Sequence, residues 1–451
     1  MVIIHIISTT IRPTEAVKKN SLTRQGISSP SLLISAFAVI VYLILVFILS
    51  RPFTGWLFFS KGDEKGLLSA AKFDPENATY HYLLGRFYHL NLQSPDIKKA
   101  AEFYSRSLKL NPLQAGVWID LSKTLHQTEG KTEEAEYALE RALKLSPRNT
   151  ELMWETGTSW LIHGNTEKAV SVLRQYLLFR PDKHIAVYDL CYKLGLTNNY
   201  LLEKLVPGSY EFRAKYLTYL MRTKRVDEAV EVWNSLDQQK IEKDIFISYV
   251  NFLIRNSMYE QATSVWKEIT PKIAGLEGTD ETFQLWNPGF ENEMLNGGFD
   301  WTINETEGVD VYIDDIIHIT GNRSLGVTFD GKHNPGIAIA RQVVMVMPSS
   351  QYKLRSYIKT EGLTTRNGML MNVQGYNCKG LGKNSEVVTG TTFWREVTID
   401  FKAPPQCNAV LISFIRKKSS KFDNKIEGTA WIDGIKLKQV TNLPKIISKK
   451  P

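Results

Sequence analysis

Three patterns of hydrophobic and polar residues follow one another along the chain. Residues 31–50 form an apolar run without a charged side chain. In residues 51–275 the apolar positions follow helical spacing, and in residues 283–440 they alternate with polar positions in short runs separated by Gly, Asn, Asp and Pro. These patterns predict a multidomain chain with one transmembrane helix, an all-α solenoid and an all-β sandwich, in that order.

The apolar run from Ser31 to Ser50 has the length of a membrane span. Twenty residues at roughly 1.5 Å per residue cross about 30 Å of hydrocarbon. A cleaved signal peptide is the alternative, but it needs a shorter apolar region and small residues at the cleavage site. Arg51, Pro52 and Trp56 follow here instead. We therefore expect an uncleaved anchor.

The charges before the run predict its orientation in the membrane. Four basic residues precede it: Arg12, Lys18, Lys19 and Arg24. One acidic residue, Glu15, lies among them. By the positive-inside rule, residues 1–30 are expected in the cytoplasm. The chain is then a single-pass protein of the inner (cytoplasmic) membrane, and its C-terminal domains are periplasmic or otherwise extracytoplasmic.

Similar phrases in the helical region end in proline at a regular period. The prolines are separated by 37, 35 and 34 residues and lie at Pro75, Pro112, Pro147 and Pro181. Small and aromatic residues recur at fixed offsets before them: Leu84, Gly85, Tyr88, Ala100 and Tyr104, then Trp118, Leu121, Ala135 and Ala142, then Gly157 and Ala169. This pattern resembles the tetratricopeptide repeat, clearest in residues 78–181 and degenerate in residues 182–275.

The resemblance implies a stack of helix pairs whose concave groove binds a protein partner, as an extended peptide or a helix. The repeat register places five candidate residues in that groove: Ile119, Lys123, His126, Trp154 and Thr158. Packing or solvation is the competing interpretation for each of them.

Residues 283–440 are expected to form an antiparallel jelly roll of about eight strands. In one predicted strand, Val397, Ile399 and Phe401 alternate with Thr398 and Asp400, so the first three should face the core. A basic tail, residues 441–451, follows the sandwich.

Three phrases of this region suggest a family. They are NPGFE at residues 287–291 followed by GGFDW ending at Trp301, GNRSLGV from Gly321, and AWIDGIKL from Ala430. Together they resemble the jelly-roll carbohydrate-binding modules attached to bacterial xylanases and cellulases. This chain shows no attached hydrolase motif, which argues against polysaccharide degradation.

The resemblance implies two kinds of site. A structural Ca²⁺ would tie the first strand to the last through Glu291 and Asp433, with backbone carbonyls completing the shell; solvated acids are the alternative. Sugar rings would stack on aromatic side chains flanked by polar groups. The candidates are Trp301, Tyr357 and Tyr376 with Arg355 and Gln374, although Trp301 is also a candidate for the core.

Charge and cysteine content narrow the partners. The net charge of +8, from 55 basic and 47 acidic residues, suits a membrane surface or an acidic polymer. Nucleic acid is not expected, because RNA-binding and zinc-finger signatures are missing.

Of the three cysteines, Cys378 and Cys407 either form a disulfide outside the cytoplasm or are unrelated thiols, while Cys191 lies in the repeats.

No GxSxG, HExxH, phosphate-loop or dinucleotide motif is present, so an enzyme is not expected. The combined prediction is a membrane-anchored scaffold that binds a protein and a carbohydrate, in envelope polysaccharide assembly or export. One alternative is a protein-interaction adaptor whose sandwich is structural. The other is a jelly-roll enzyme acting on polysaccharide, which would need two carboxylates converging in a groove.

Overall fold

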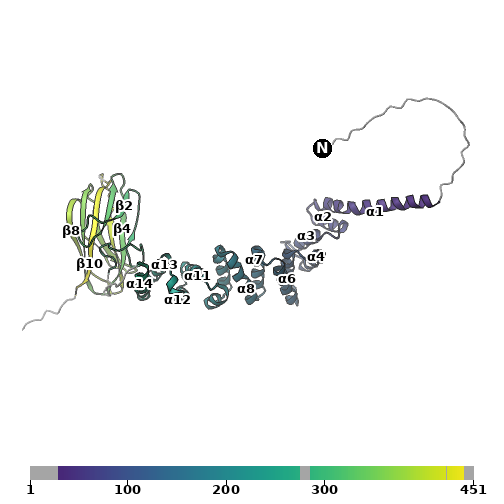
Figure 1. Cartoon of the computed structure of the whole chain (residues 1–451), viewed down its shortest axis with the longest axis horizontal. Coiled ribbons are helices and arrows are strands. Elements are labelled where there is room, and N and C mark those ends of the chain that lie inside the picture. The colour runs from purple at the N-terminus through teal and green to yellow at the C-terminus, as the bar shows by residue number, and fades with distance from the viewer. Residues whose placement is uncertain (1–28, 275–284, 423, 441–451) are drawn as a thin grey trace, which may run out of the picture. The chain divides into compact units, whose positions relative to one another are not determined.

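The computed structural model of the chain describes residues 29–274, 285–422 and 424–440 (Figure 1). The predicted cytoplasmic segment before Ser29 and the basic tail from residue 441 lie outside these ranges. Helices occupy the described chain up to α14, and strands β1 to β10 follow, which confirms the predicted order of an all-α and an all-β region. The chain divides into two compact units, residues 1–176 and 177–451, which are described separately.

Helix α1 (Ser29–Phe59) contains a segment long and apolar enough to cross a membrane, Ile34–Phe59. By length and composition a signal sequence passes the same test. The helix extends past the predicted end at Ser50, because its last turns pack on α2 (Glu64–Phe73). Phe58 stacks on Phe73 with ring centroids 5.1 Å apart, and Arg51 Nε donates to Phe73 O at 3.0 Å. The contacts with α2 thus stabilise the part of α1 that follows Pro52.

Helix pairs follow α2 in the first unit. Their bounds are α3 (Ala78–His89), α4 (Ile97–Leu110), α5 (Ala115–His126), α6 (Thr132–Leu145), α7 (Thr150–Ile162) and α8 (Thr166–Phe179), which continues into the second unit. The predicted small residues lie where paired helices meet. A Cβ atom on Gly85 of α3 would overlap the ring of Tyr104 on α4, and one on Gly157 of α7 would lie 2.9 Å from Leu173 of α8. Glycine therefore permits both close approaches.

The helices of the second unit are less regular. They are η1 (Pro181–Lys183), α9 (His184–Lys193), α10 (Asn198–Tyr200), η2 (Leu201–Leu205), α11 (Tyr210–Arg222), α12 (Val226–Asn234), η3 (Gln238–Lys240), α13 (Lys243–Arg255) and α14 (Tyr259–Ala274). A three-residue helix and the π-turn η2 stand where a full second helix would follow α9. Buried tyrosines, Tyr188 and Tyr216 with ring centroids 4.8 Å apart, fill the space between α9 and α11.

The β region consists of two five-stranded antiparallel sheets. The β4 sheet has the order β1-β4-β9-β6-β7 and the β5 sheet the order β2-β3-β10-β5-β8. Their strands are β1 (Thr302–Ile303), β2 (Val309–Asp314), β3 (Ser324–Asp330), β4 (Ile337–Met345), β5 (Gln351–Leu363), β6 (Met369–Gly375), β7 (Gly382–Asn384), β8 (Gly390–Lys402), β9 (Ala409–Arg416) and β10 (Glu427–Gln439). One hydrophobic core joins the two sheets, which confirms the predicted sandwich.

The predicted alternation in β8 is confirmed. Val397, Ile399 and Phe401 are buried, whereas Thr398 and Asp400 are exposed. The strand therefore contributes one face to the core and the other to solvent.

The sandwich packs directly on the last two helices, and we call this contact the seam. Trp266 of α14 meets Trp286 and Phe299 edge-on, with ring centroids 5.6 and 5.8 Å apart. Asn251 Oδ1 of α13 accepts a hydrogen bond from Gly298 N at 3.0 Å. Residues 182–275 and 283–440, predicted as separate regions, thus belong to one compact unit.

Candidate functional site

Trp301, the first aromatic candidate for sugar stacking, lies in the sandwich core. Its side chain is 0% exposed, and its ring packs against Phe290 and Phe414, with centroids 5.5 and 5.8 Å away. The indole Nε1 donates to Asn287 O at 3.0 Å. With both ring faces covered by protein, Trp301 presents no face to a sugar.

The structure divides the other four sugar candidates between the two sheets. Arg355 and Tyr357 lie on β5, and both contact Glu396 of β8: the Tyr357 hydroxyl donates to it at 3.0 Å, and an Arg355 nitrogen lies 3.6 Å from it. Gln374 lies next to the last residue of β6 in the β4 sheet, and Tyr376 follows that strand. These two pairs therefore belong to different surfaces. In the second pair, Gln374 lines one cavity and Tyr376 lines a neighbouring one.

A cavity of about 480 Å³ lies on the outer face of the β4 sheet, and we call it the sheet cavity. Amide, hydroxyl and cationic side chains from β4, β6, β7, β9 and the residue after β9 line it: Arg341, Asn372, Gln374, Asn384, Ser413 and Lys417, with Ala338, Gly382, Leu411 and Ile415. Asn372 Nδ2 donates to Asn384 Oδ1 at 2.9 Å and to Lys383 O at 3.1 Å. These hydrogen bonds fix the orientation of both amides at the cavity wall.

A second cavity, the seam pocket, has a volume of about 350 Å³ and borders the first, because Arg341 and Leu411 line both. Helix α13 and the sandwich each supply part of its wall: Asn251, Ile254 and Arg255 from the helix, and Asn296, Gly298, Asp300, Thr302, Arg341, Val343, Tyr376 and Leu411 from the sandwich. The sequence analysis did not find Arg255 or Arg341. Arg255 is the last residue of α13, and the seam brings it to the sandwich.

Positive charge dominates the seam pocket. Burial raises the pKa of the Tyr376 phenol, and the guanidinium groups of Arg255 and Arg341 oppose that rise. Asp300 is the one acid among the residues lining the two cavities. Burial raises the pKa of its carboxyl to about 6, and this carboxyl accepts hydrogen bonds from Leu295 N at 2.6 Å and Trp301 N at 2.7 Å.

Cys378 and Cys407 form a disulfide with a Cα–Cα distance of 5.4 Å, which decides between the two alternatives left by the sequence. The bond holds the segment after β6 that carries Tyr376 and Asn377. Asn377 Nδ2 in turn lies within hydrogen-bonding distance of Arg255 O (3.3 Å) and Ser257 Oγ (3.2 Å). The disulfide therefore supports the wall of the seam pocket.

The carboxylates expected to bind calcium, Glu291 and Asp433, lie close together. A Cβ atom at Gly289 would be 3.5 Å from Glu291 Oε1 and 3.6 Å from Asp433 Oδ1. Asp433 is buried and accepts four hydrogen bonds, and Glu291 Oε1 accepts two. The donors to Asp433 are the N–H groups of Ile319, Thr320 and Gly434 and the Thr320 hydroxyl, and the donors to Glu291 are the N–H groups of Asn322 and Arg323.

With these hydrogen bonds in place, the carboxylates of Glu291 and Asp433 do not fit the coordination of a calcium ion. A carboxylate offers about four lone pairs, and all of those on Asp433 are used by hydrogen-bond donors. Calcium needs six to eight oxygen ligands. Within the described ranges, no group of three or more His, Cys, Asp and Glu residues is placed to hold a metal.

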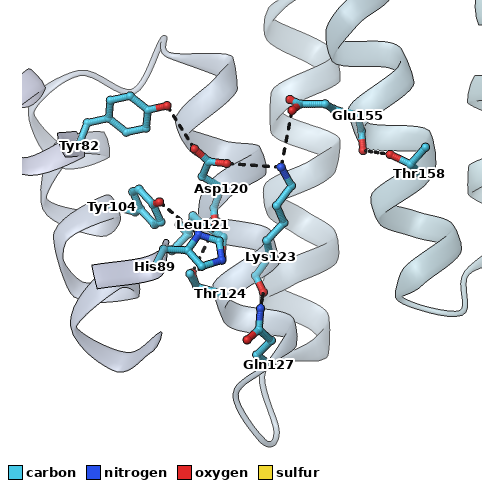
Figure 2. A network of polar contacts seen from close by, with 10 residues as sticks. All are labelled: Tyr82, His89, Tyr104, Asp120, Leu121, Lys123, Thr124, Gln127, Glu155 and Thr158. Atoms are coloured by element: carbon cyan, nitrogen blue, oxygen red, sulfur yellow. Dashed lines mark hydrogen bonds and ion pairs between the residues drawn. The ribbon is translucent and has the colours of Figure 1, made fainter. Parts of the chain in front are cut away.

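The candidates for the repeat groove lie on α5 and α7, and Figure 2 shows two of them in a polar network. Lys123 Nζ lies 3.5 Å from Asp120 and 3.7 Å from Glu155 of α7, and Asp120 also accepts from Tyr82 of α3 at 3.2 Å. Thr158 Oγ1 donates to the carbonyls of residues 154 and 155. The network thus joins α3, α5 and α7.

The other three groove candidates are packed against protein. Ile119 is 0% exposed and belongs to the helix core. His126 stacks on His163 with ring centroids 3.9 Å apart, and Trp154 packs against Tyr176 at 5.6 Å. Lys123 and Thr158, with their partners in the network, therefore remain the polar candidates for contact with a peptide.

One family model matches part of the helical region. The tetratricopeptide repeat family model matches residues 124–183, and no curated protein matches. Similar solved structures include a Family 16 Carbohydrate Binding Module-2, with 17% identity and a TM-score of 0.25 over 34% of this chain and 99% of that one. Another is TmCBM61 in complex with β-1,4-galactotriose, with 16% identity and a TM-score of 0.25 over 35% of this chain and 98% of that one.

The helical part is similar to YrrB, a TPR protein with an unusual peptide-binding site (16% identity, TM-score 0.23, covering 46% of this chain and 92% of that one). A bacteriophage CBA120 tailspike protein also matches (13% identity, TM-score 0.24). That match covers 35% of this chain and 21% of the tailspike chain. At these TM-scores, the likeness to solved structures carries no inference about a ligand of this chain. Residues 124–183 thus match the tetratricopeptide repeat model, and an antiparallel β-sandwich follows the helical region.

Proposed function

We propose that the chain is a non-catalytic scaffold anchored in the cytoplasmic membrane by α1, which binds a carbohydrate in the sheet cavity and a protein partner on its helical repeats. Envelope polysaccharide assembly or export is the process in which both ligands would meet. The sheet cavity carries this proposal, because its oriented amides, hydroxyl and cations are the groups that bind sugar hydroxyls.

The disulfide supports an extracytoplasmic location for the sandwich. Disulfides persist in oxidising compartments and are rare in the cytosol. Cys378 and Cys407 are bonded, whereas Cys191 is a buried free thiol in the helical region. This distribution agrees with α1 as an anchor whose C-terminal side faces away from the cytoplasm.

Catalysis is not part of the proposal. A polysaccharide-active site would need two carboxylates facing one substrate. Asp300 is the one carboxylate among the residues that line the two cavities, and it lines the seam pocket. Its oxygens accept backbone hydrogen bonds. Glu291 and Asp433 do converge, but N–H donors occupy them.

The test is binding of a glycan array and of polysaccharide affinity gels by the detergent-solubilised full chain. Asn384→Ala and Gln374→Ala, both in the sheet cavity, should abolish retention. The matched control is Tyr357→Ala on the β5 sheet, which should retain binding while losing its hydrogen bond to Glu396. Loss of binding in the control alone would move the carbohydrate site to the β5 sheet.

A specific observation favours a second function, that of an adaptor whose sandwich is structural. The sandwich covers Trp266 of α14 and thereby closes the end of the helical stack. Trp301 is buried, and Tyr357 and Tyr376 lie on different sheets, so the three candidate rings form no common platform. If no glycan is retained by the full chain, the adaptor becomes the better description.

A further inference from the structure

The seam pocket brings together two arginines from parts of the fold that are far apart in sequence. Arg255 ends helix α13, and Arg341 lies on β4 of the sandwich. Both line the pocket, and both act electrostatically on the hydroxyl of Tyr376. The cavity thus combines two cations, a phenol that can donate a hydrogen bond, and one carboxyl, Asp300, whose oxygens accept backbone hydrogen bonds from Leu295 and Trp301.

Neither arginine is neutralised by an ion pair within the described part of the chain. The Arg255 Nε–H donates to Asn251 O at 3.0 Å, which orients the guanidinium without compensating its charge. The ion pairs of the described residues include no carboxylate partner for Arg255 or Arg341. Both arginines are exposed residues that line one cavity, and guanidinium groups arranged in this way favour an anionic ligand between them.

The seam holds Arg255 in place. Asn377 bonds to the carbonyl of Arg255, Asn251 accepts from Gly298 N, and the ring of Trp266 covers the neighbouring loop. These contacts hold the backbone at Arg255, and the bond from its Nε–H to Asn251 O orients the side chain, so less conformational entropy is lost when a ligand binds.

We propose that the seam pocket holds the carboxylate of an acidic sugar, a uronic acid, between Arg255 of the helical repeats and Arg341 of the sandwich. This inference rests on the proposed function and names its ligand class: an acidic glycan whose other residues extend along the sheet cavity, which shares Arg341 with the pocket. The helical array is then part of the carbohydrate site.

The lining favours a glycan over an acidic peptide. Peptides that bind sheets usually add as a strand to a free edge, where unpaired backbone N–H and C=O groups are available. The sheet cavity lies instead on the face of paired strands β4, β9, β6 and β7, and side-chain amides and a hydroxyl face the ligand. Such groups match the closely spaced hydroxyls of a sugar chain.

The experiment measures affinity by isothermal titration of the full chain with oligomers of galacturonate, glucuronate and mannuronate, each beside its methyl ester. The ester keeps the shape of the sugar and removes the charge. Esterification should weaken binding by about tenfold to a hundredfold, the range for a hydrogen bond between charged groups. Arg255→Gln should reproduce this loss for the acid and leave the ester unchanged, because Arg255 lines the seam pocket and not the sheet cavity. Arg341→Gln should reproduce the loss for the acid and also weaken binding of the ester, because Arg341 lines both cavities.

Arg366→Gln is the matched control, because Arg366 is an exposed residue of the sandwich that lines neither cavity. It should leave all affinities unchanged, and the melting temperatures of the three variants should match that of the wild type. Equal binding of acid and ester, or neutral glycans bound with no effect of Arg255→Gln, would overturn the inference while the proposed function stands.

Two other outcomes also overturn the inference. If no glycan of either kind binds, the proposed carbohydrate function fails with it. If oligoglutamate binds with the same dependence on Arg255 and Arg341 and the uronates do not, the pocket recognises an acidic peptide.

Discussion

Gly298 lies so close to Trp266 that a Cβ atom on the glycine would overlap the indole ring. The glycine belongs to the first loop of the sandwich, and the tryptophan belongs to the last described helix of the repeats. Gly298 also has φ +63°, a backbone conformation that residues with a Cβ rarely adopt. One position therefore satisfies two constraints of the seam.

Substitution of this glycine should loosen the seam. Gly298→Ala is expected to lower the free energy of unfolding of the second unit by roughly 2 to 4 kcal/mol, from overpacking against Trp266 and from the strained φ. Urea titration followed by tryptophan fluorescence measures the change. Gly208→Ala is the control, because a Cβ there meets nothing within 4 Å and its φ is not positive. Equal effects of the two substitutions would contradict the seam as described.

Reduction of the disulfide should destabilise the sandwich and weaken glycan binding together. The Cys378–Cys407 bond closes a loop with a sequence separation of 29 residues, and such bonds contribute about 2 to 4 kcal/mol. Calorimetry with and without reductant should show a lower melting temperature in the wild type.

The variant Cys378→Ser/Cys407→Ser provides the control for that experiment. It should melt at the lower temperature under both conditions. Cys191 will not interfere, because burial raises the pKa of its thiol to about 12. A reductant effect that persists in the double variant would assign the loss to another cause.

Asp300 should make the stability of the second unit depend on pH. Burial raises the pKa of its carboxyl from 3.8 to about 6, so the folded state binds the proton more tightly than the unfolded state. The resulting stabilisation is fully present below the unfolded pKa and is lost as the pH rises through the folded pKa. The difference corresponds to roughly 3 kcal/mol.

Urea titrations of wild type and Asp300→Asn at several pH values test this sign. As the pH is raised from about 4 to 7, the wild type should lose up to roughly 3 kcal/mol relative to the variant, whose amide does not titrate. Parallel pH profiles would show that Asp300 titrates at its unfolded value in the folded protein.

Calcium should change the stability of the sandwich little. Because hydrogen-bond donors occupy the oxygens of Asp433, we expect the melting temperature to be unaffected by millimolar Ca²⁺ or by a chelator. Asp433→Asn should lower the free energy of unfolding by about 1 to 3 kcal/mol in either condition, since buried N–H groups lose their acceptor. A clear rise of the wild-type melting temperature with Ca²⁺ would show that the donors give way to the metal.

The sequence predicted local structure well and long-range contacts poorly. Glycines at the helix crossings and the alternation in β8 follow from periods of a few residues, so Gly85, Gly157 and Val397 lie where expected. The sequence left Trp301 as a candidate both for sugar stacking and for the core, and the structure places it in the core. In the same phrase, Gly298 permits a close approach to Trp266.

The seam pocket shows why a site can escape sequence analysis. Arg255 and Arg341 lie in different periodic patterns, and nothing in either pattern reveals that α13 and β4 meet. The pairing of Gln374 and Tyr376 with one sheet, and of Arg355 and Tyr357 with the other, likewise depends on strand order. Strand order is set by contacts distant in sequence, which local periodicity does not record.

Helix α1 passes from its apolar segment into the contact with α2 without an intervening loop. In a bilayer this leaves no hinge between anchor and scaffold, so any tilt of the membrane helix turns the first repeat with it. A change in bilayer thickness, which helices accommodate by tilting, would reorient the repeats above the surface. The anchor would thus set the angle of the first repeat to the membrane, in addition to tethering the chain.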